Sequence, residues 1–153
     1  MAGAQYSVYI DDDEIHQRLN KLLEKGTDLT PAFATIGEDL LISHHQRFLD
    51  QISPEGVPWA PLSETTKALK TKNVDTILVF NDFLRSTLNY QPLPESLLFG
   101  SPLEYAATHQ FGRETAPNSM IPNKEIPARP FLGIDEGDRD MILDNLSDFL
   151  MNR

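Results

Sequence analysis

Apolar side chains recur at two different spacings along the first third of the chain, and each spacing predicts a local structure. Residues 5–10, QYSVYI, alternate apolar and polar positions, which is typical of a half-buried strand. Residues 11–26 place apolar side chains three and four positions apart, from an acidic cap to a terminal glycine, and predict a helix. Residues 30–52 repeat that spacing after a threonine cap and a first-turn proline, which predicts the longest helix.

The middle of the chain favours short strands. TILVF at 76–80 is a β-branched and aromatic run, and STLNY at 86–90 and SLLF at 96–99 flank a proline-rich turn as the arms of a hairpin do. Before them, SPEGVPWAPL at 53–62 holds three prolines around the only tryptophan, Trp59. Because proline disrupts helices and central strands, this stretch predicts an ordered but irregular connection, followed by a short helix.

The last third predicts two helices separated by a loop. Residues 101–111 begin with a serine cap and a first-turn proline and end before Gly112, which suits a left-handed helix end. Residues 113–125 are polar, contain two prolines and lack periodicity, and so predict an exposed loop. PARPFLGI at 127–134 predicts an edge strand, and Asp135 then caps a final helix.

The order of these elements indicates the fold class. Strand, helix, helix, three strands, short helix, strand and helix is the order of an α+β protein, with a small, mainly antiparallel sheet of about four strands packed against two long helices and a C-terminal helix. A length of 153 residues suits one hydrophobic core. We therefore expect residues 1–153 to form a single α+β domain with an exposed loop at 113–125.

Composition narrows the classes of function. The chain has no cysteine, which excludes disulfide frameworks, thiolate nucleophiles and thiolate metal sites. No apolar run approaches the roughly 20 residues of a membrane span, so we expect no membrane association. The formal net charge of −10 repels phosphate and disfavours proteins that read a nucleic-acid sequence.

Three histidines are the candidates for chemistry. His109 falls in the last predicted turn of a helix, where the dipole favours its charged form, and it is a catalytic base, a metal ligand or a packed side chain. The packed interpretation is preferred because no serine, cysteine or acid stands at a triad spacing. His44 and His45 point about 100° apart on a helix and do not face one metal, and His44 falls on the apolar stripe as a partly buried ring. We predict no catalytic residue, no metal and no cofactor, and hence no enzyme.

Four segments, taken in order, carry a family resemblance. They are RFLDQISPEGVPWAPLSETTKALK, ILVFNDFLRSTLNY, YAATHQFG and IPARPFLGIDEGDRDMI, and with the long helix before them they run from about Ile36 to the C-terminus. This series resembles the phage virion morphogenesis family, the tail completion proteins of contractile-tailed phages. That family has a Thr-Gly or similar pair before the hairpin, whereas this chain has Asn81 and Asp82, which tolerate the turn geometry of glycine.

The resemblance implies a non-enzymatic virion protein at the head–tail junction, present in the host cytoplasm during assembly. It implies a homo-oligomer, a hexameric neck ring that contacts the tail tube or sheath and head-side neck proteins, while DNA passes through without specific binding. Whether the ring acts as tail terminator, completion protein or head-side adaptor stays open. The anchors carried over by the motifs are Trp59, Leu62, Tyr105, His109, Phe111, Gly112, Pro127, Arg129, Pro130 and Phe131.

The residue types suggest how these anchors act. Tyr105 and Phe111 before the loop, and Phe131 with Leu132 after it, are expected to clamp the loop ends against the sheet. Arg129 lies between two prolines and is expected to bind a carboxylate at small entropic cost.

Two rival functions stay open at this point. One is a small metal-assisted hydrolase that uses His44, His109 and nearby carboxylates. The other is a neck adaptor that recruits one partner through loop 113–125.

Overall fold

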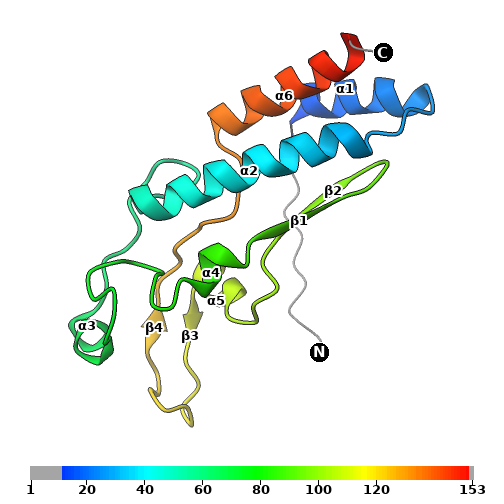
Figure 1. The fold of residues 1–153 in the computed structure, drawn as a ribbon. Coiled ribbons are helices and arrows are strands. Elements are labelled where there is room, and N and C mark those ends of the chain that lie inside the picture. Colours follow the sequence, from blue (N-terminus) through cyan, green and yellow to red (C-terminus); the bar gives the residue numbers. More distant parts are fainter. Residues whose placement is uncertain (1–11, 152–153) are drawn as a thin grey trace. The chain divides into compact units, whose positions relative to one another are not determined.

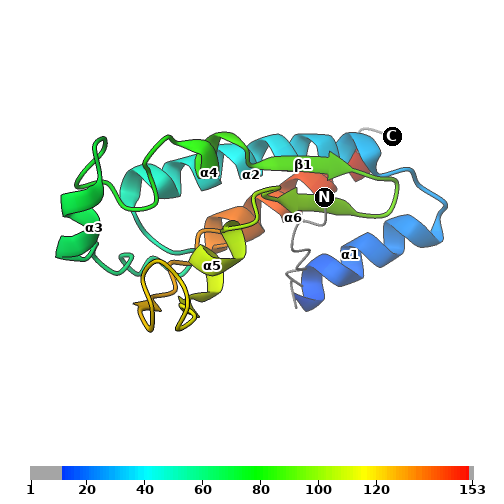
Figure 2. The ribbon, with the colours of Figure 1, turned by 90° about the horizontal axis from the view of Figure 1, so that it is seen from below.

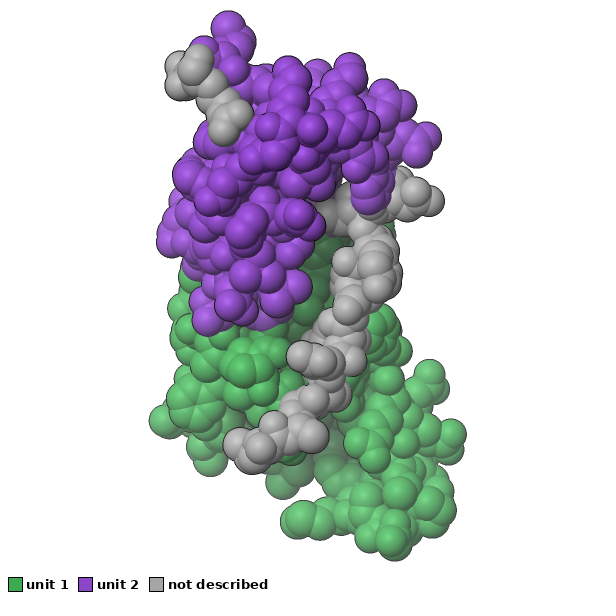
Figure 3. Space-filling model, turned by 90° about the vertical axis from the view of Figure 1, so that its right-hand side faces the viewer, with its two compact units in different colours: residues 1–6, 44–88, 101–133 green, residues 7–43, 89–100, 134–153 purple. Residues whose placement is uncertain are grey.

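The computed structural model describes residues 12–151 (Figure 1) and divides them into two compact units, which Figure 3 colours separately. Unit 1 holds residues 44–88 and 101–133, and unit 2 holds residues 12–43, 89–100 and 134–151. The predicted strand at 5–10 and the predicted cap at Asp11 lie outside the described residues. The expectation of a single domain stays a prediction.

Unit 2 consists of helices and one hairpin. Its helices are α1 (Asp13–Glu24), the first part of α2 (Thr30–Asp50) and α6 (Glu136–Met151), and its hairpin joins β1 (Asn89–Pro92) to β2 (Leu97–Gly100). Apolar side chains of the three helices form one buried cluster, as their helical spacing predicts. Its members are Ile15, Leu22, Leu29, Phe33, Ile36, Leu40, Ile142, Leu143 and Leu146.

Side-chain caps set where the outer helices begin. The carboxylate of Asp12 accepts hydrogen bonds from the backbone N–H groups of Glu14 and Ile15, so α1 is capped at Asp12. The carboxylate of Asp135 accepts from the N–H of Asp138 at 2.7 Å, which confirms the predicted cap of the final helix. Arg139 on α6 bonds both Asp12 and Glu14, and this ion pair joins the start of α6 to the start of α1.

The predicted hairpin is confirmed, and it packs closely on α2. β1 and β2 are antiparallel with Tyr90 opposite Phe99, and the hairpin lies beside the helices of unit 2 (Figure 2). The ring of Tyr90 covers Gly37, where an added Cβ would lie 2.3 Å from a ring carbon, and the Tyr90 hydroxyl donates to Glu38 at 2.6 Å. Only glycine at position 37 allows this approach of hairpin to helix.

Unit 1 is built from short elements on the last turns of α2. They are α3 (Glu64–Leu69), α4 (Phe83–Ser86), α5 (Ala106–Phe111), and a second antiparallel hairpin of β3 (Arg113–Glu114) and β4 (Glu125–Ile126). The α+β class is confirmed, with the four strands divided between two hairpins instead of joined in one sheet. The predicted irregular connection and the short helix after it are also confirmed.

The predicted strand at residues 76–80 is wrong. The ammonium of Lys70 donates to the carbonyls of Thr76 and Val79 at 2.8 and 2.9 Å, and Leu78 has φ +59°. The Lys70 side chain therefore donates to carbonyls that would otherwise accept hydrogen bonds from a neighbouring strand. Just beyond it, Asp82 has φ +64°, the left-handed geometry for which Asp stands in for glycine.

Within residues 12–151, no helix combines the length and the hydropathy that crossing a bilayer requires.

Candidate functional site

Three aromatic rings form the apolar centre of unit 1. Phe48, on the last turns of α2, packs edge-on against Trp59 with ring centroids 5.3 Å apart. It also packs against Phe131, with centroids 5.8 Å apart. All three rings are buried, so the tryptophan of the irregular connection and the phenylalanine of PARPFLGI belong to one core.

Gln110 on α5 binds the backbone next to that core. Its side-chain oxygen accepts from the N–H groups of Phe131 and Leu132 at 3.0 and 2.9 Å, and its side-chain nitrogen donates to the carbonyl of Leu132 at 3.0 Å. An amide group that is buried in this way presents the same donor and acceptors as a neighbouring strand.

Three more side chains complete the contacts of segment 130–133. Trp59 donates from Nε1 to the carbonyl of Pro130 at 2.7 Å. Arg47 donates from Nη1 to the carbonyls of Phe131 and Gly133, and His44 Nε2 accepts from the N–H of Gly133 at 3.4 Å. Together with Gln110, these side chains form a set that we term the cradle: His44, Arg47, Trp59 and Gln110.

The cradle explains why the predicted edge strand at 127–134 is wrong. Every backbone N–H and C=O from the carbonyl of Pro130 to the carbonyl of Gly133 bonds to a cradle side chain. Side chains therefore make the hydrogen bonds that a partner strand would make, so these buried backbone groups have partners without a sheet.

Arg129 bonds to carbonyl groups, and the prediction of a carboxylate partner is wrong. Its guanidinium donates to the carbonyls of Ala60 and Pro61 at 2.7 and 2.9 Å, and its N–H donates to the carbonyl of His109 at 2.7 Å. Burial lowers the pKa of Arg129, because water is removed from the charge, and the carbonyl dipoles replace part of that solvation. Arg129 thus ties the PWAPL connection to the end of α5.

Gly112 is required by two separate constraints. It ends α5 with φ +75°, which confirms the predicted glycine helix end. An added Cβ would lie 2.9 Å from both the N–H nitrogen of Ala128 and the carbonyl oxygen of Ile126. The main chain of the returning strand therefore passes too close for any side chain at position 112.

His109 is a packed side chain with its neutral form favoured. Its ring meets Tyr105 edge-on with centroids 5.9 Å apart. Burial lowers the pKa of His109, and the positive charge of Arg129 lowers it further. Burial and the neighbouring cation thus favour the neutral form, opposite to the direction expected from the helix dipole.

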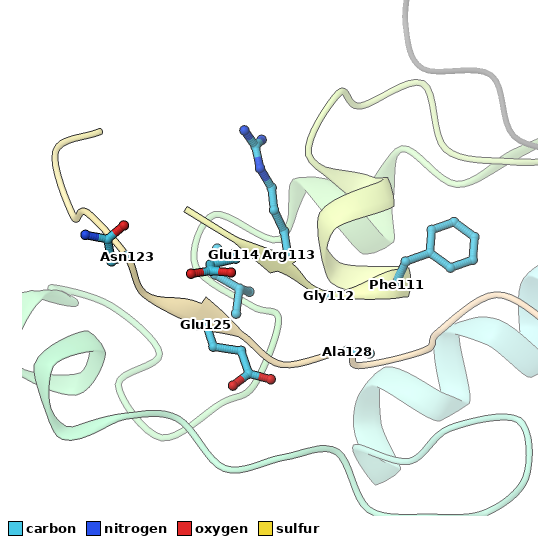
Figure 4. A pocket seen from close by; sticks show the side chains of 8 residues that line it. Phe111, Gly112, Arg113, Glu114, Asn123, Glu125 and Ala128 are labelled. Atoms are coloured by element: carbon cyan, nitrogen blue, oxygen red, sulfur yellow. The ribbon is translucent and has the colours of Figure 1, made fainter. Parts of the chain in front are cut away.

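An open hollow of about 600 Å³ lies at the base of the β3–β4 hairpin (Figure 4). Phe111, Gly112, Ile126 and Ala128 line it together with polar side chains. The expectation that four side chains clamp the loop ends against a sheet is met only as burial for Phe131 and Leu132, and Phe131 packs on Phe48 of α2. It is wrong for Tyr105 and Phe111, whose side chains are 45% and 60% exposed.

The remaining anchors occupy structural positions. Leu62 is half-buried at the end of the connection before α3, and Pro127 directly follows β4. Two cradle residues, Arg47 and Gln110, were not singled out from the sequence. Arg47 did carry a signal, since it stands three residues after His44 on the apolar stripe of α2, where a charge needs a buried partner.

No group of three or more His, Cys, Asp or Glu side chains in residues 12–151 is placed to hold a metal ion. His44 faces the backbone of Gly133, and His109 faces Tyr105, so the two histidines of the hydrolase hypothesis have separate structural partners.

Comparison with known protein families identifies a match over nearly the whole chain. The model of the phage virion morphogenesis family matches residues 10–151 of this chain. Searches of curated proteins and of solved structures returned no match.

Proposed function

The chain belongs to the phage virion morphogenesis family, which gives it a structural or assembly role in a virion, and from this premise we propose that it is a tail completion protein. In this proposal it forms a hexameric ring at the head–tail junction. The ring contacts the tail tube or sheath on one side and head-side neck proteins on the other.

The cradle is the observation that favours assembly over catalysis. His44, Arg47, Trp59 and Gln110 are buried polar or amphipathic groups of unit 1, and all four bond to the backbone of their own chain. An enzyme needs polar groups that converge on a substrate pocket. Here these groups converge on the largely buried segment 130–133 of their own chain, so they serve to hold the fold of a structural subunit.

The negative charge of the chain supports a ring through which DNA passes without being bound. A ring of subunits that each carry a formal net charge of −10 repels a passing duplex. Specific and non-specific DNA binding both depend on lysine and arginine side chains that displace counterions from phosphates. The proposed ring therefore lets DNA pass, and the purified protein leaves duplex DNA unshifted in a gel at physiological salt.

The test is a joining reaction in which heads and tails are prepared from phage lacking this protein. The proposal expects separate heads and tails in the deficient extract, and joined particles after the purified protein is added. A Gln110→Met variant, which loses the three cradle bonds that Gln110 makes, should restore joining less well than an exposed control, Gln46→Met. Full joining without any added protein contradicts the proposal.

A neck adaptor that recruits one partner through loop 113–125 is the second candidate. The observation in its favour is that this loop is exposed and yet hydrogen-bonded within itself. An adaptor stays monomeric and forms one complex of fixed 1:1 mass, whereas a ring subunit associates with itself.

A further inference from the structure

The β3–β4 hairpin holds its tip in one shape. Thr115 is the centre of its hydrogen bonds: its hydroxyl donates to the carbonyl of Ile121 and accepts from the N–H of Lys124. Ser119 also donates to the carbonyl of Ile121. This network presents a fully exposed Met120 next to an exposed Ile121. An apolar tip that is ordered before binding loses little entropy when a partner covers it.

The base of the same hairpin carries an unfavourable charge pair. Glu114 lies directly opposite Glu125 in the strand register, and both side chains are exposed. Like charges in directly opposite positions destabilise a two-stranded sheet. A cation from another molecule would relieve this repulsion. We define the hairpin face as Phe111, Glu114, Met120, Ile121 and Glu125.

A second exposed apolar surface lies in the segment between α3 and α4. Asn73 donates to the carbonyl of Phe80 at 2.9 Å, and Lys70 bonds two further carbonyls, so this segment is also tied within itself. Its exposed side chains include the apolar Val74 and Phe80 and the basic Lys72, and the exposed Leu69 and Phe83 flank it at the end of α3 and the start of α4. We define the loop face as Leu69, Lys72, Val74, Phe80 and Phe83.

We propose that the hairpin face of one copy docks on the loop face of the next copy, and this inference rests on the self-association contained in the proposed function. The two faces consist of different residues of unit 1, so the contact is heterologous and repeats from copy to copy, as a closed ring requires. Met120 and Ile121 pack on Phe80 and its apolar neighbours. Lys72 approaches the Glu114–Glu125 pair.

Charge favours a second copy of this chain as the occupant. Two molecules of net charge −10 repel each other, so they associate best where the local charge is small. Residues 113–126 carry two bases and two acids, and residues 67–83 carry three lysines and two aspartates. The two faces are also complementary, because the hairpin face exposes an acidic pair beside apolar side chains and the loop face exposes Lys72 beside apolar side chains.

The test measures self-association of the full chain by sedimentation velocity over a range of concentrations. Met120→Asp and Phe80→Asp each remove one face, and Met151→Asp is the matched control, since Met151 is 82% exposed and belongs to unit 2. We expect each face variant to raise the dissociation constant about tenfold or more, and the control to leave it unchanged. Circular dichroism checks that the variants keep their helices.

Mixing the two face variants gives the sharper result. Each keeps the face that the other lacks, so an equimolar mixture forms one productive contact and yields a 1:1 dimer but no ring. No dimer in the mixture overturns the proposal, as does a face variant that still assembles like the wild type. If both face variants assemble normally but fail to join heads to tails, the faces bind another protein, and the ring proposal stands without this contact. A wild-type chain that stays monomeric overturns both.

Discussion

Buried polar side chains in unit 1 bond to the main chain of residues brought near by folding. Gln110 reaches segment 130–133, and Arg129 reaches the carbonyls of Ala60 and Pro61. A hydrogen bond contributes little net stability when it forms, but a buried backbone group left without a partner costs its full desolvation. Removing one of these side chains therefore lowers stability mainly because it leaves buried backbone groups without hydrogen-bond partners.

Replacing Gln110 by methionine, which has a similar length, tests this directly. The change leaves the N–H groups of Phe131 and Leu132 and the carbonyl of Leu132 without partners, and we expect the free energy of unfolding to fall by about 3 kcal/mol. Gln46→Met, on the exposed side of α2, should change it by less than about 0.5 kcal/mol. Urea denaturation measures both, and equal losses would contradict the role of the cradle.

The lowered pKa of His109 predicts that the folded chain loses stability in mild acid. Its pKa in the folded chain is lowered by burial and by Arg129, while the unfolded chain titrates near the ordinary value of 6.5. Below that value the unfolded state binds more protons at this residue, so the stabilising contribution is present above it and declines as the pH falls. Urea denaturation between pH 7.5 and about 5 should show a weaker pH dependence for His109→Gln than for the wild type. Parallel curves would show that His109 titrates alike in both states.

At the scale of elements, close main-chain approaches depend on particular glycines. Gly112 and Gly26 both have positive φ, yet an added Cβ meets main-chain atoms at 2.9 Å in the first case and nothing within 4 Å in the second. Gly37 adds a third situation, in which the obstacle is the Tyr90 side chain. The three positions therefore predict different effects of an alanine substitution on the free energy of unfolding.

Gly112→Ala should cost about 3 kcal/mol or more in the free energy of unfolding, because it combines backbone strain with a clash against Ile126 and Ala128. Gly26→Ala should cost about 1 kcal/mol, since it adds only the strain of the left-handed conformation. Thermal unfolding of the two variants gives the comparison. If Gly26→Ala proved the more damaging, the close approach at Gly112 would be refuted.

Gly37→Ala tests the packing of the hairpin on α2 by a double-mutant cycle. In the wild type the added methyl meets the Tyr90 ring at 2.3 Å, and we expect a net loss of about 1–3 kcal/mol. In a Tyr90→Ala background the obstacle is gone, and alanine should stabilise the helix by up to about 1 kcal/mol. The same effect in both backgrounds would mean that the ring does not cover this position.

The three long helices, α3 and the first hairpin were predictable because their signals are local, whereas α4 was not predicted and α5 begins at Ala106 and not next to the predicted cap at Ser101. A cap at Asp135, a breaker such as Gly112 and a proline-rich turn act within a few residues of their own position. The irregular structure of the β-prone runs TILVF and PARPFLGI was not predictable. A strand needs a partner strand, and here side chains from outside each run make the hydrogen bonds that a partner strand would make. Lys70 bonds the first run, and the cradle bonds the second.

The candidate site was predictable in part for the same reason. Trp59, Gly112 and Phe131 stand in motifs, and the structure brings them into one region of unit 1. Gln110 was missed because a glutamine on a short helix gives no sign of what it faces. The acceptors of Arg129 were misjudged because carbonyl groups belong to every residue and leave no mark in a sequence.

At the scale of the whole molecule, net charge governs how copies approach one another. Each copy carries a formal net charge of −10, so long-range repulsion opposes assembly and salt screens it. We expect self-association to strengthen between roughly 20 mM and 300 mM NaCl, where the Debye length shortens from about 20 Å to about 6 Å. Sedimentation velocity at both salt concentrations measures this. Weaker association at high salt would mean that ion pairs dominate the contact.

Electron cryomicroscopy of the assembled phage particle tests the account most directly. The account predicts density for this chain as a sixfold ring at the head-proximal end of the tail, with the β3–β4 hairpin of each copy against its neighbour. Finding no copy of this chain in the particle, or finding it as single molecules away from the junction, would contradict the account.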